Sequence, residues 1–146
     1  MEWTRDRYRV TDDRNAIDVD RVHRWLSDDA YWARGRARAI VERSIAGSVV
    51  FGLLHESDGL AGFCRMVTDR ATFAWLCDVY VDPSHRGSGA GTFLVECAVR
   101  HPELAALQRQ VLATADAHGL YERFGFRRFG DADRDRWMIR DSTMLC

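Results

Sequence analysis

The residues with the clearest capacity for chemistry form the glycine-rich segment Arg86-Gly87-Ser88-Gly89-Ala90-Gly91, which lies between an apolar strand-like run and a helical pattern. Glycines let the backbone approach a ligand without obstruction by Cβ atoms. The first turn of the following helix offers unpaired N–H groups and the positive end of the helix dipole. The segment is therefore predicted to bind an anion such as a pyrophosphate.

Two common phosphate-binding loops do not fit this segment. The dinucleotide pattern GxGxxG would need glycine where the chain has Thr92, and it normally opens a βαβ unit. The Walker pattern needs a lysine, whereas all 21 residues counted as Lys plus Arg are arginine. The lack of lysine also excludes a pyridoxal Schiff base and the ATP-pairing lysine of kinases. The pattern that remains is Q/R-x-x-G-x-G/A, with Arg86, Gly89 and Gly91 at its fixed positions.

This pattern resembles the coenzyme A pyrophosphate loop of the GNAT superfamily of N-acetyltransferases. Downstream, the motif Asp-Ala-His-Gly-Leu-Tyr-x-x-Phe-Gly-Phe ends at Phe126. It is similar to the tyrosine-bearing helix that follows the family's fifth strand, in a version typical of a small bacterial branch. The resemblance covers about Ser48 to Phe129 and implies acetyl-coenzyme A as the cosubstrate, with no metal.

The resemblance also implies which residues hold the cosubstrate. Main-chain groups of the strand before the loop would bind the pantetheine, with an N–H near Val79 facing the thioester carbonyl. The loop and the start of its helix would bind the pyrophosphate. The expected cofactor-binding residues are Val79, Tyr80, Val81, Arg86, Gly87, Ser88, Gly89, Ala90, Gly91, Thr92, Thr114 and Tyr121.

Acetyl transfer to an amine needs an acid for the leaving thiolate and a base for the amine. Tyr121 is the expected acid, although it could simply pack beside Phe124 on its helix. The family often carries a glutamate where this chain has Trp75, which cannot accept a proton. The catalytic candidates for the base are therefore Asp78 and His118, with solvent as the third alternative.

The acceptor is expected to be a primary amine of a small molecule or peptide. Tyr31 and Trp32 lie between the first two predicted helices, where the family builds the wall of its substrate site, and they could stack on a cationic or flat acceptor. Alternatively, they fold back into the core. Asp78 and Asp116 complete the expected substrate-binding residues. Asp28, Asp29 and Asp116 could attract a positively charged amine, or they could serve as helix caps and turn formers.

Two other classes of function compete with an acetyltransferase. One is a non-catalytic domain of the same fold that binds or senses acyl-coenzyme A. The other is a nucleotide-binding enzyme of different architecture, which is disfavoured because both alternative phosphate-loop patterns fail.

The elements that must position these residues are predicted from hydrophobic periodicity. The element order predicts an α+β fold with one βαβ crossover. The resemblance implies a GNAT-like version of it, with a mixed, mostly antiparallel central sheet that is splayed between its fourth and fifth strands and flanked by about four helices. The predicted strands are Tyr8–Thr11, Ser48–His55, Leu60–Val67, Phe73–Val81, Gln110–Ala115 and Gly125–Phe129. The predicted helices are a first one through Ile17, Val22 and Leu26, then Arg36–Ile45, one after Gly89, and Leu120–Phe124.

Length and composition agree with one domain over residues 1–146. The net charge of −1 argues against nucleic acid as a partner. A secretory signal and a membrane-spanning run are not evident, so the chain is expected to be cytoplasmic, with no membrane partner. The tail Gly130–Cys146 could add a final strand or a homodimer contact. Cys64, Cys77 and Cys97 are expected to be small buried residues and Cys146 a free thiol.

Overall fold

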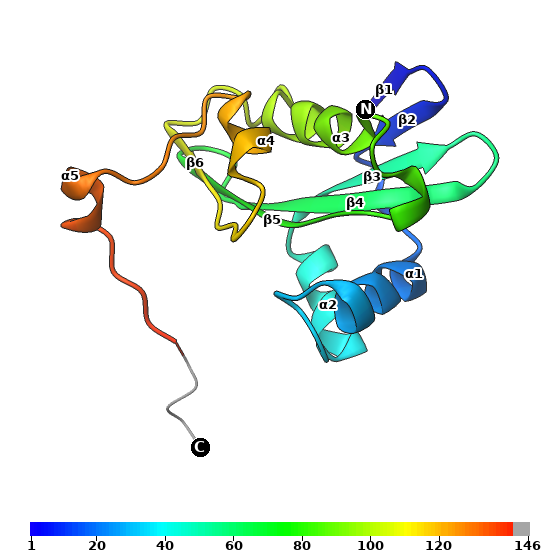
Figure 1. Ribbon diagram of the computed structural model, residues 1–146, viewed down its shortest axis with the longest axis horizontal. Helices are drawn as coiled ribbons and strands as arrows, with labels where there is room; N and C mark the ends of the chain where they lie inside the picture. Colours follow the sequence, from blue (N-terminus) through cyan, green and yellow to red (C-terminus); the bar gives the residue numbers. More distant parts are fainter. Residues whose placement is uncertain (142–146) are drawn as a thin grey trace.

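The computed structural model describes residues 1–141, which form one six-stranded sheet with its strands in sequence order (Figure 1). Only the last pair of strands is parallel, which confirms the predicted α+β class with a mixed, mostly antiparallel sheet. The strands are β1 (Glu2–Arg5), β2 (Tyr8–Thr11), β3 (Val49–His55), β4 (Gly59–Thr68), β5 (Phe73–Val81) and β6 (Arg109–Val111).

The helices lie mainly in two groups, one before β3 and one after β5. The α-helices are α1 (Val19–Arg24), α2 (Arg38–Ala46), α3 (Ala90–Val99), α4 (His118–Glu122) and α5 (Asp131–Arg134). Short 3-10 helices occur at η1 (Arg14–Ala16) and η3 (Pro83–His85), and η2 (Trp25–Asp29) is a π-helix that continues α1. Within residues 1–141, no helix is long and apolar enough to cross a membrane.

The sheet begins with a hairpin whose first strand the sequence pattern did not predict. β1 pairs antiparallel with β2 through a turn in which Asp6 has a φ of 52°. Only Trp3 of β1 is partly buried, so the strand lacks the apolar alternation that marks β2. Because β1 was not counted, the fourth and fifth strands expected from the sequence are β5 and β6.

A β-bulge at Asp78 reverses the faces of β5. The register between β4 and β5 shifts between Phe63 and Arg65, and Asp78 has a φ of 53°. Ala74 and Leu76 consequently face one hydrophobic cluster, whereas Tyr80, which has the same parity, packs into the other. One inserted residue changes which side chains of a strand face the core, and here it turns Asp78 away from the α3 side.

The predicted splay of the sheet is confirmed by the pairing of β5 with β6. Parallel pairs run from Phe73↔Arg109 to Trp75↔Val111 and then stop, although β5 continues to Val81. The two strands therefore part after Trp75, the third of the nine residues of β5, leaving the rest of this strand with an open edge.

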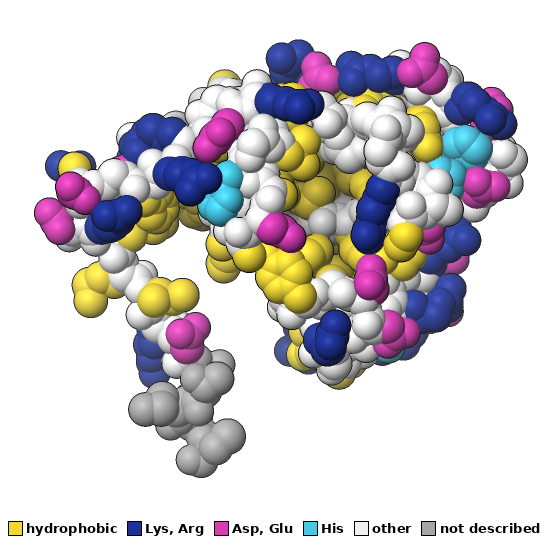
Figure 2. Space-filling view, in the orientation of Figure 1, with side chains coloured by type: hydrophobic (Ala, Val, Ile, Leu, Met, Phe, Trp, Pro, Cys, Tyr) yellow, Lys and Arg dark blue, Asp and Glu magenta, His cyan; other side chains and the backbone are white. Residues whose placement is uncertain are grey.

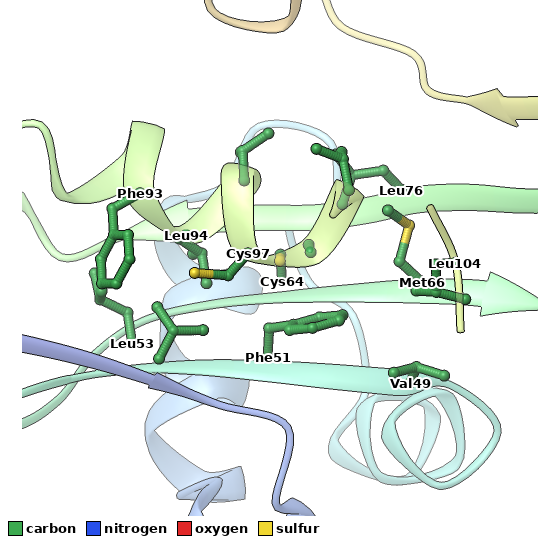
Figure 3. Close-up of a cluster of buried hydrophobic side chains, with 14 of the residues drawn as sticks. Val49, Phe51, Leu53, Cys64, Met66, Leu76, Phe93, Leu94, Cys97 and Leu104 are labelled. Carbon is green, nitrogen blue, oxygen red and sulfur yellow. The ribbon is translucent and has the colours of Figure 1, made fainter. Parts of the chain in front are cut away.

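Two hydrophobic clusters cover opposite faces of the sheet. The cluster beneath α3 includes Phe51, Leu53, Met66 and Leu94 (Figure 3). The cluster on the other face holds α1, η2 and α2 through residues such as Val22, Trp25, Leu26, Val41 and Phe63. Cys64 and Cys97 are buried as expected, Cys77 is half-buried, and Cys146 lies outside the described residues.

The C-terminal part differs from its prediction. Residues 125–129 form no strand: Gly125 makes a turn with a φ of 86°, and Arg127 is held by an ion pair with Asp133 on α5. Residues 130–141 also contain no strand, and they lead away from the body of the molecule (Figure 1). The strand expected over Gln110–Ala115 is limited to β6, which begins one residue earlier and ends at Val111.

Candidate functional site

The glycine-rich loop joins the open end of β5 to α3. Asp82 caps η3 by accepting the N–H of Ser84 at 3.0 Å, and the exposed loop follows. Gly87 and Gly89 have φ values of 80° and 82°, a region that favours glycine. The first main-chain bond of α3 runs from the N–H of Phe93 to the carbonyl of Gly89. The N–H groups of the first turn, including Ala90, Gly91 and Thr92, therefore have no partner within the helix.

Main-chain groups of β5 continue this polar surface. The N–H of Asp82 donates to the carbonyl of Ala61 on β4 at 2.9 Å. Because main-chain groups alternate in direction along a strand, those of Tyr80 also face β4, and those of Val79 and Val81 face the open edge. Of the groups expected to contact a pantetheine, the main-chain groups of Val79 and the N–H of Val81 are thus directed toward the splay, whereas the carbonyl of Val81 is engaged by Arg86.

Arg86 is engaged by the protein itself. Its Nε donates to the carbonyl of Val81 at 2.8 Å, and its guanidinium lies 3.3 Å from a carboxylate oxygen of Asp29 and 5.2 Å from the ring centre of Tyr80. To bind a phosphate, Arg86 would have to exchange or share these contacts.

Tyr80 was expected to bind the cofactor, but its side chain is directed elsewhere. It is 5% exposed and stacks on Trp25 with ring centres 5.2 Å apart. Its hydroxyl donates to Asp29 at 2.5 Å, and burial together with this carboxylate raises its pKa to about 12. Because the Tyr80 side chain is buried on the face opposite α3, it cannot contact a ligand in the splay.

Tyr121 enters the site from α4. Its side chain is 8% exposed, packs in the cluster beneath α3 and meets Phe126 edge-on. Burial raises the pKa of this phenol to about 12, with further contributions from Cys64, Tyr31 and Asp116. These neighbours belong to β4 and to the two loops beside the splay, so the phenol lies close to the open part of the sheet and is protonated at neutral pH.

Asp78 lies at the centre of a buried polar network. One carboxylate oxygen accepts from Arg65 at 2.7 Å and from Arg36 at 2.9 Å, and the other accepts from the indole of Trp32 at 3.1 Å. The Asp78 side chain is only 3% exposed. Two guanidinium groups neutralise the carboxylate and occupy its oxygens, so the arrangement does not offer a free proton acceptor.

Tyr31 and Trp32 stand at the surface, which excludes the alternative that they fold back into the core. They are 53% and 43% exposed, and their rings meet edge-on at 5.0 Å. The hydroxyl of Tyr31 accepts the N–H of Ala115 at 3.1 Å. This bond links the connection between η2 and α2 to the loop between β6 and α4, on the open side of the sheet.

The remaining candidates lie in the loop after β6, at the start of α4 and in the glycine loop. Thr114 accepts the N–H of Ala117 at 3.1 Å, Asp116 is exposed, and His118 begins α4. Thr114, His118 and Tyr121 also line a groove of about 950 Å³ on the outer side of β6. Ser88 in the glycine loop donates to the carbonyl of His85 at 2.9 Å.

These groups surround a hollow in the surface. Figure 2 shows the molecule hollowed over β5, with apolar side chains at the bottom, α3 above, the layer of η2 and α2 below, and α4 and η3 at the sides. The arrangement combines helix-start amides, an open main-chain edge and a buried phenol. It can hold an extended ligand that carries an anionic group at one end.

Sequence reasoning missed Arg36 and Arg65, and it named Asp29 only as a carboxylate that could attract an amine, not as the partner of Arg86 and Tyr80. Arg65 carried a signal, because a charged residue inside the apolar run of β4 needs a buried partner. Arg36 and Asp29 lie in polar connections, and no spacing could relate them to Asp78 or Arg86 before the bulge and the π-helix were known.

The chain belongs to the GNAT acetyltransferase family. Residues 46–128 match the sequence profile of the family described as "Acetyltransferase (GNAT) domain". This segment contains β3 to α4 and both motifs on which the resemblance rested.

Individual relatives agree with this assignment. A crystal structure of a Xanthomonas campestris pv. campestris protein, provisionally described as a GNAT acetyltransferase, is 39% identical, has a TM-score of 0.88 and covers 97% of this chain and 98% of its own. A Gibberella zeae protein with a provisional acetyltransferase name is 29% identical over 91% of this chain and 86% of its own length.

A more distant structure shares the fold. It is a predicted acetyltransferase from Clostridium acetobutylicum, solved with acetyl-CoA, with 16% identity and a TM-score of 0.65 over 92% of this chain and 94% of its own.

Proposed function

We propose that this protein transfers an acetyl group from acetyl-coenzyme A to the primary amine of a small molecule or peptide. The proposal depends most on one observation: the amides at the start of α3, the open edge of β5 and the buried phenol of Tyr121 surround the same hollow. Family membership supports the reaction class, and the geometry supports the roles of individual residues.

The residues present fit an acyl-coenzyme A. Amides at the start of α3 would bind the pyrophosphate, helped by the dipole of this ten-residue helix. A Cβ atom at Gly91 would meet the side chain of Val81 at 3.4 Å, so glycine keeps the helix close to β5. The main-chain groups of Val79 and the N–H of Val81 would pair with the pantetheine arm, whereas the carbonyl of Val81 already accepts from Arg86.

The chemistry needs one proton removed and one supplied. Acetyl-coenzyme A provides an acetyl thioester. A carbon–nitrogen bond forms to the neutral amine as the carbon–sulfur bond breaks, the amine loses its proton, and the thiolate gains one. We assign the proton that the thiolate gains to the hydroxyl of Tyr121. Burial keeps this hydroxyl protonated, and its neighbours Tyr31 and Asp116 belong to the loops beside the splay.

We assign Asp78 a positioning role rather than that of the base. Its carboxylate ties the indole of Trp32 to the bulge of β5 and is neutralised by Arg36 and Arg65. His118 at the start of α4 or solvent would then take the amine proton. Either choice leaves the ion pairs of Asp78 intact during the reaction.

The acceptor would enter beside the exposed rings of Tyr31 and Trp32. Aromatic faces attract a cationic group, and exposed Asp116 adds a negative charge on the facing loop. The bond from Ala115 to Tyr31 sets the separation between these two walls. The fit favours an acceptor with a flat or positively charged part.

Thiol release from acetyl-coenzyme A in the presence of an amine panel tests the proposed function. We expect release that depends on the amine and saturates with it. Each reaction needs a blank without the amine and a blank without the protein, because thioesters hydrolyse.

The second candidate is a domain that binds or senses acyl-coenzyme A without catalysis. The observation that favours it is that Arg36 and Arg65 pair with Asp78, so this carboxylate is not free to act as a base. Calorimetry separates the two functions. Tight binding of acetyl-coenzyme A without release by any amine would favour the sensor and contradict the transferase.

A further inference from the structure

Two histidines and one aspartate meet beside the glycine loop, outside the proposed acetyl-transfer site. His55 ends β3, Asp58 lies in the turn to β4, and His85 ends η3 immediately before Arg86. One ligand atom from each residue lies within 4.8 Å of the other two. Figure 2 shows histidine and acidic side chains side by side at this end of the β3–β4 hairpin. We propose that this triad binds a divalent transition metal of the zinc class.

The distances fit such an ion. His55 Nδ1 and His85 Nε2 each lie 3.2 Å from the same carboxylate oxygen of Asp58. Metal–ligand bonds of about 2.0–2.2 Å at tetrahedral angles place ligand atoms about 3.3–3.6 Å apart. Two of the three separations are therefore already suitable, and a small rotation of one imidazole would close the third.

The exposure of the three side chains also fits a metal site that is enclosed on one side and open to solvent on the other. The side chains of His55 and His85 are 11% and 9% exposed, whereas Asp58 is 56% exposed. The imidazoles are thus held by their surroundings, and solvent can supply a fourth ligand near Asp58. Two imidazole nitrogens and a carboxylate favour zinc-like ions over magnesium or calcium, which prefer oxygen ligands.

A hydrogen-bond network orients His85 for this role. Its Nδ1 lies 2.9 Å from the hydroxyl of Tyr8, which lies 3.4 Å from the hydroxyl of Ser88, and Ser88 donates to the carbonyl of His85. If Nδ1–H donates to Tyr8 and Tyr8 donates to Ser88, every hydroxyl proton has an acceptor and Nε2 keeps its lone pair. Such outer partners fix the tautomer of a metal-bound histidine.

The site would connect metal binding to the loop. His85 adjoins Arg86, and Ser88 lies within the loop, whereas His55 and Asp58 belong to the β3–β4 hairpin. A bound ion would tie the hairpin to the loop and reduce the motion of its amides. This consequence rests on the proposed function, but metal binding itself does not.

Metal binding is tested on untagged protein stripped with a chelator and then dialysed. Zinc is titrated by calorimetry, and cobalt is followed by its visible absorption. We expect one ion per chain and a cobalt spectrum unlike that of the free ion. Asp58→Asn and His55→Gln should each weaken binding more than tenfold, and Tyr8→Phe by about tenfold or more.

A matched control is the buried pair of His101 and Asp12, whose nitrogen and oxygen lie 3.1 Å apart without a second histidine ligand. His101→Gln should retain full metal binding. Circular dichroism in chelator checks that each variant is folded; Asp58 is 56% exposed, and Asp58→Asn alters only its contacts with His55 and His85. Absence of saturable binding by the wild type, or equal binding by Asp58→Asn, overturns the metal site.

The link to the loop has its own readout. Coenzyme A affinity is measured by calorimetry with and without zinc, and we expect the loaded protein to bind about fivefold or more tightly. Zinc bound at one per chain with unchanged coenzyme A affinity would refute the link. Failure of acetyl transfer would leave both binding measurements interpretable.

Discussion

Asp78 is the central residue of the buried polar network, because its carboxylate contacts Trp32, Arg36 and Arg65. Arg36 and Arg65 face it at 2.9 and 2.7 Å, and their side chains are 22% and 13% exposed. Removing one partner from a largely buried ion pair leaves the other charge uncompensated. The network therefore acts as a structural support between β4, β5 and the start of α2.

Asp78→Asn should lower the free energy of unfolding by about 3 kcal/mol, because two guanidinium groups lose their counter-charge. Urea unfolding measures the loss. Glu42→Gln serves as the control, since it removes one of the two exposed partners of Arg38 and should cost about 0.5 kcal/mol or less. Equal losses in the two variants would show that the Asp78 network does not contribute as described.

Because the phenol of Tyr121 is buried, the free energy of unfolding should fall as the pH rises into the alkaline range. Its pKa is about 12 in the folded chain and about 10 when unfolded. The unfolded chain therefore loses the proton first, so the stabilisation is complete below about pH 10 and declines as the pH rises toward 12. We expect Tyr121 to contribute a loss of up to about 3 kcal/mol across this window.

Urea unfolding from pH 9 to pH 11.5 checks this expectation, with Tyr121→Phe as the comparison. The variant should lose less stability than the wild type over the same range. Tyr80, whose pKa is also raised to about 12, remains in both proteins and contributes equally. Identical pH profiles for the two proteins would contradict the burial of an ionisable phenol at position 121.

At the scale of elements, the loop between β5 and α3 depends on backbone conformation. Gly89 has a φ of 82°, and a Cβ atom added there would meet nothing within 4 Å, so conformation rather than space demands glycine. Gly89→Ala should cost about 1–2 kcal/mol of stability. It should also weaken coenzyme A binding by about tenfold, because relaxation of the strain would displace the amides at the start of α3.

Gly119→Ala in α4 is the matched control. Its Cβ would also meet nothing within 4 Å, and its φ is not positive. Alanine should stabilise this helix by up to about 1 kcal/mol and leave coenzyme A affinity unchanged. Calorimetry on both variants decides the matter, and equal affinity for Gly89→Ala and wild type would argue against the assigned role of the loop.

Much of the element order was predictable because most elements are marked by local sequence patterns, such as apolar runs and turn residues. The meander β3–β4–β5 has continuous apolar runs and a turn at Gly59, and the glycine loop announces the start of α3. Residues 125–129 were expected to form a strand, but the chain turns at Gly125 and forms no strand there. Whether such a segment joins a sheet depends on its tertiary context more than on its own residues.

Only part of the candidate site was predictable from the sequence. The loop, Val79, Val81 and Tyr121 follow from motifs, whereas the engagement of Asp78 and Arg86 depends on a bulge and a π-helix. Tyr80 illustrates the limit: it sits between two residues that face the splay, but its side chain is buried on the opposite face. A homodimer contact through the tail stays a prediction.

At the scale of the whole molecule, the single domain expected over residues 1–146 stays a prediction that folding experiments can test. Neighbouring residues on β3 anchor the two clusters, with Phe51 beneath α3 and Val50 facing α1 and α2. A shared sheet should make both faces unfold together. Phe51→Ala should cost about 3–5 kcal/mol and lower protection on both faces.

Hydrogen exchange followed by mass spectrometry measures this coupling. Amides of α3 and of α2 should lose protection in parallel in the Phe51→Ala protein. Loss confined to α3, with α2 unchanged, would divide the chain into two independently folding parts.

The central claim is that acetyl-coenzyme A donates its acetyl group to an amine while Tyr121 protonates the thiolate. Mass spectrometry of the acceptor, combined with thiol detection, tests it most directly in wild type and Tyr121→Phe. We predict acetylated amine in equal amount to released thiol, and a fall in turnover of about 10²–10⁴-fold in the variant with unchanged acetyl-coenzyme A affinity. Released thiol without acetylated amine, or full turnover by Tyr121→Phe, would contradict the account.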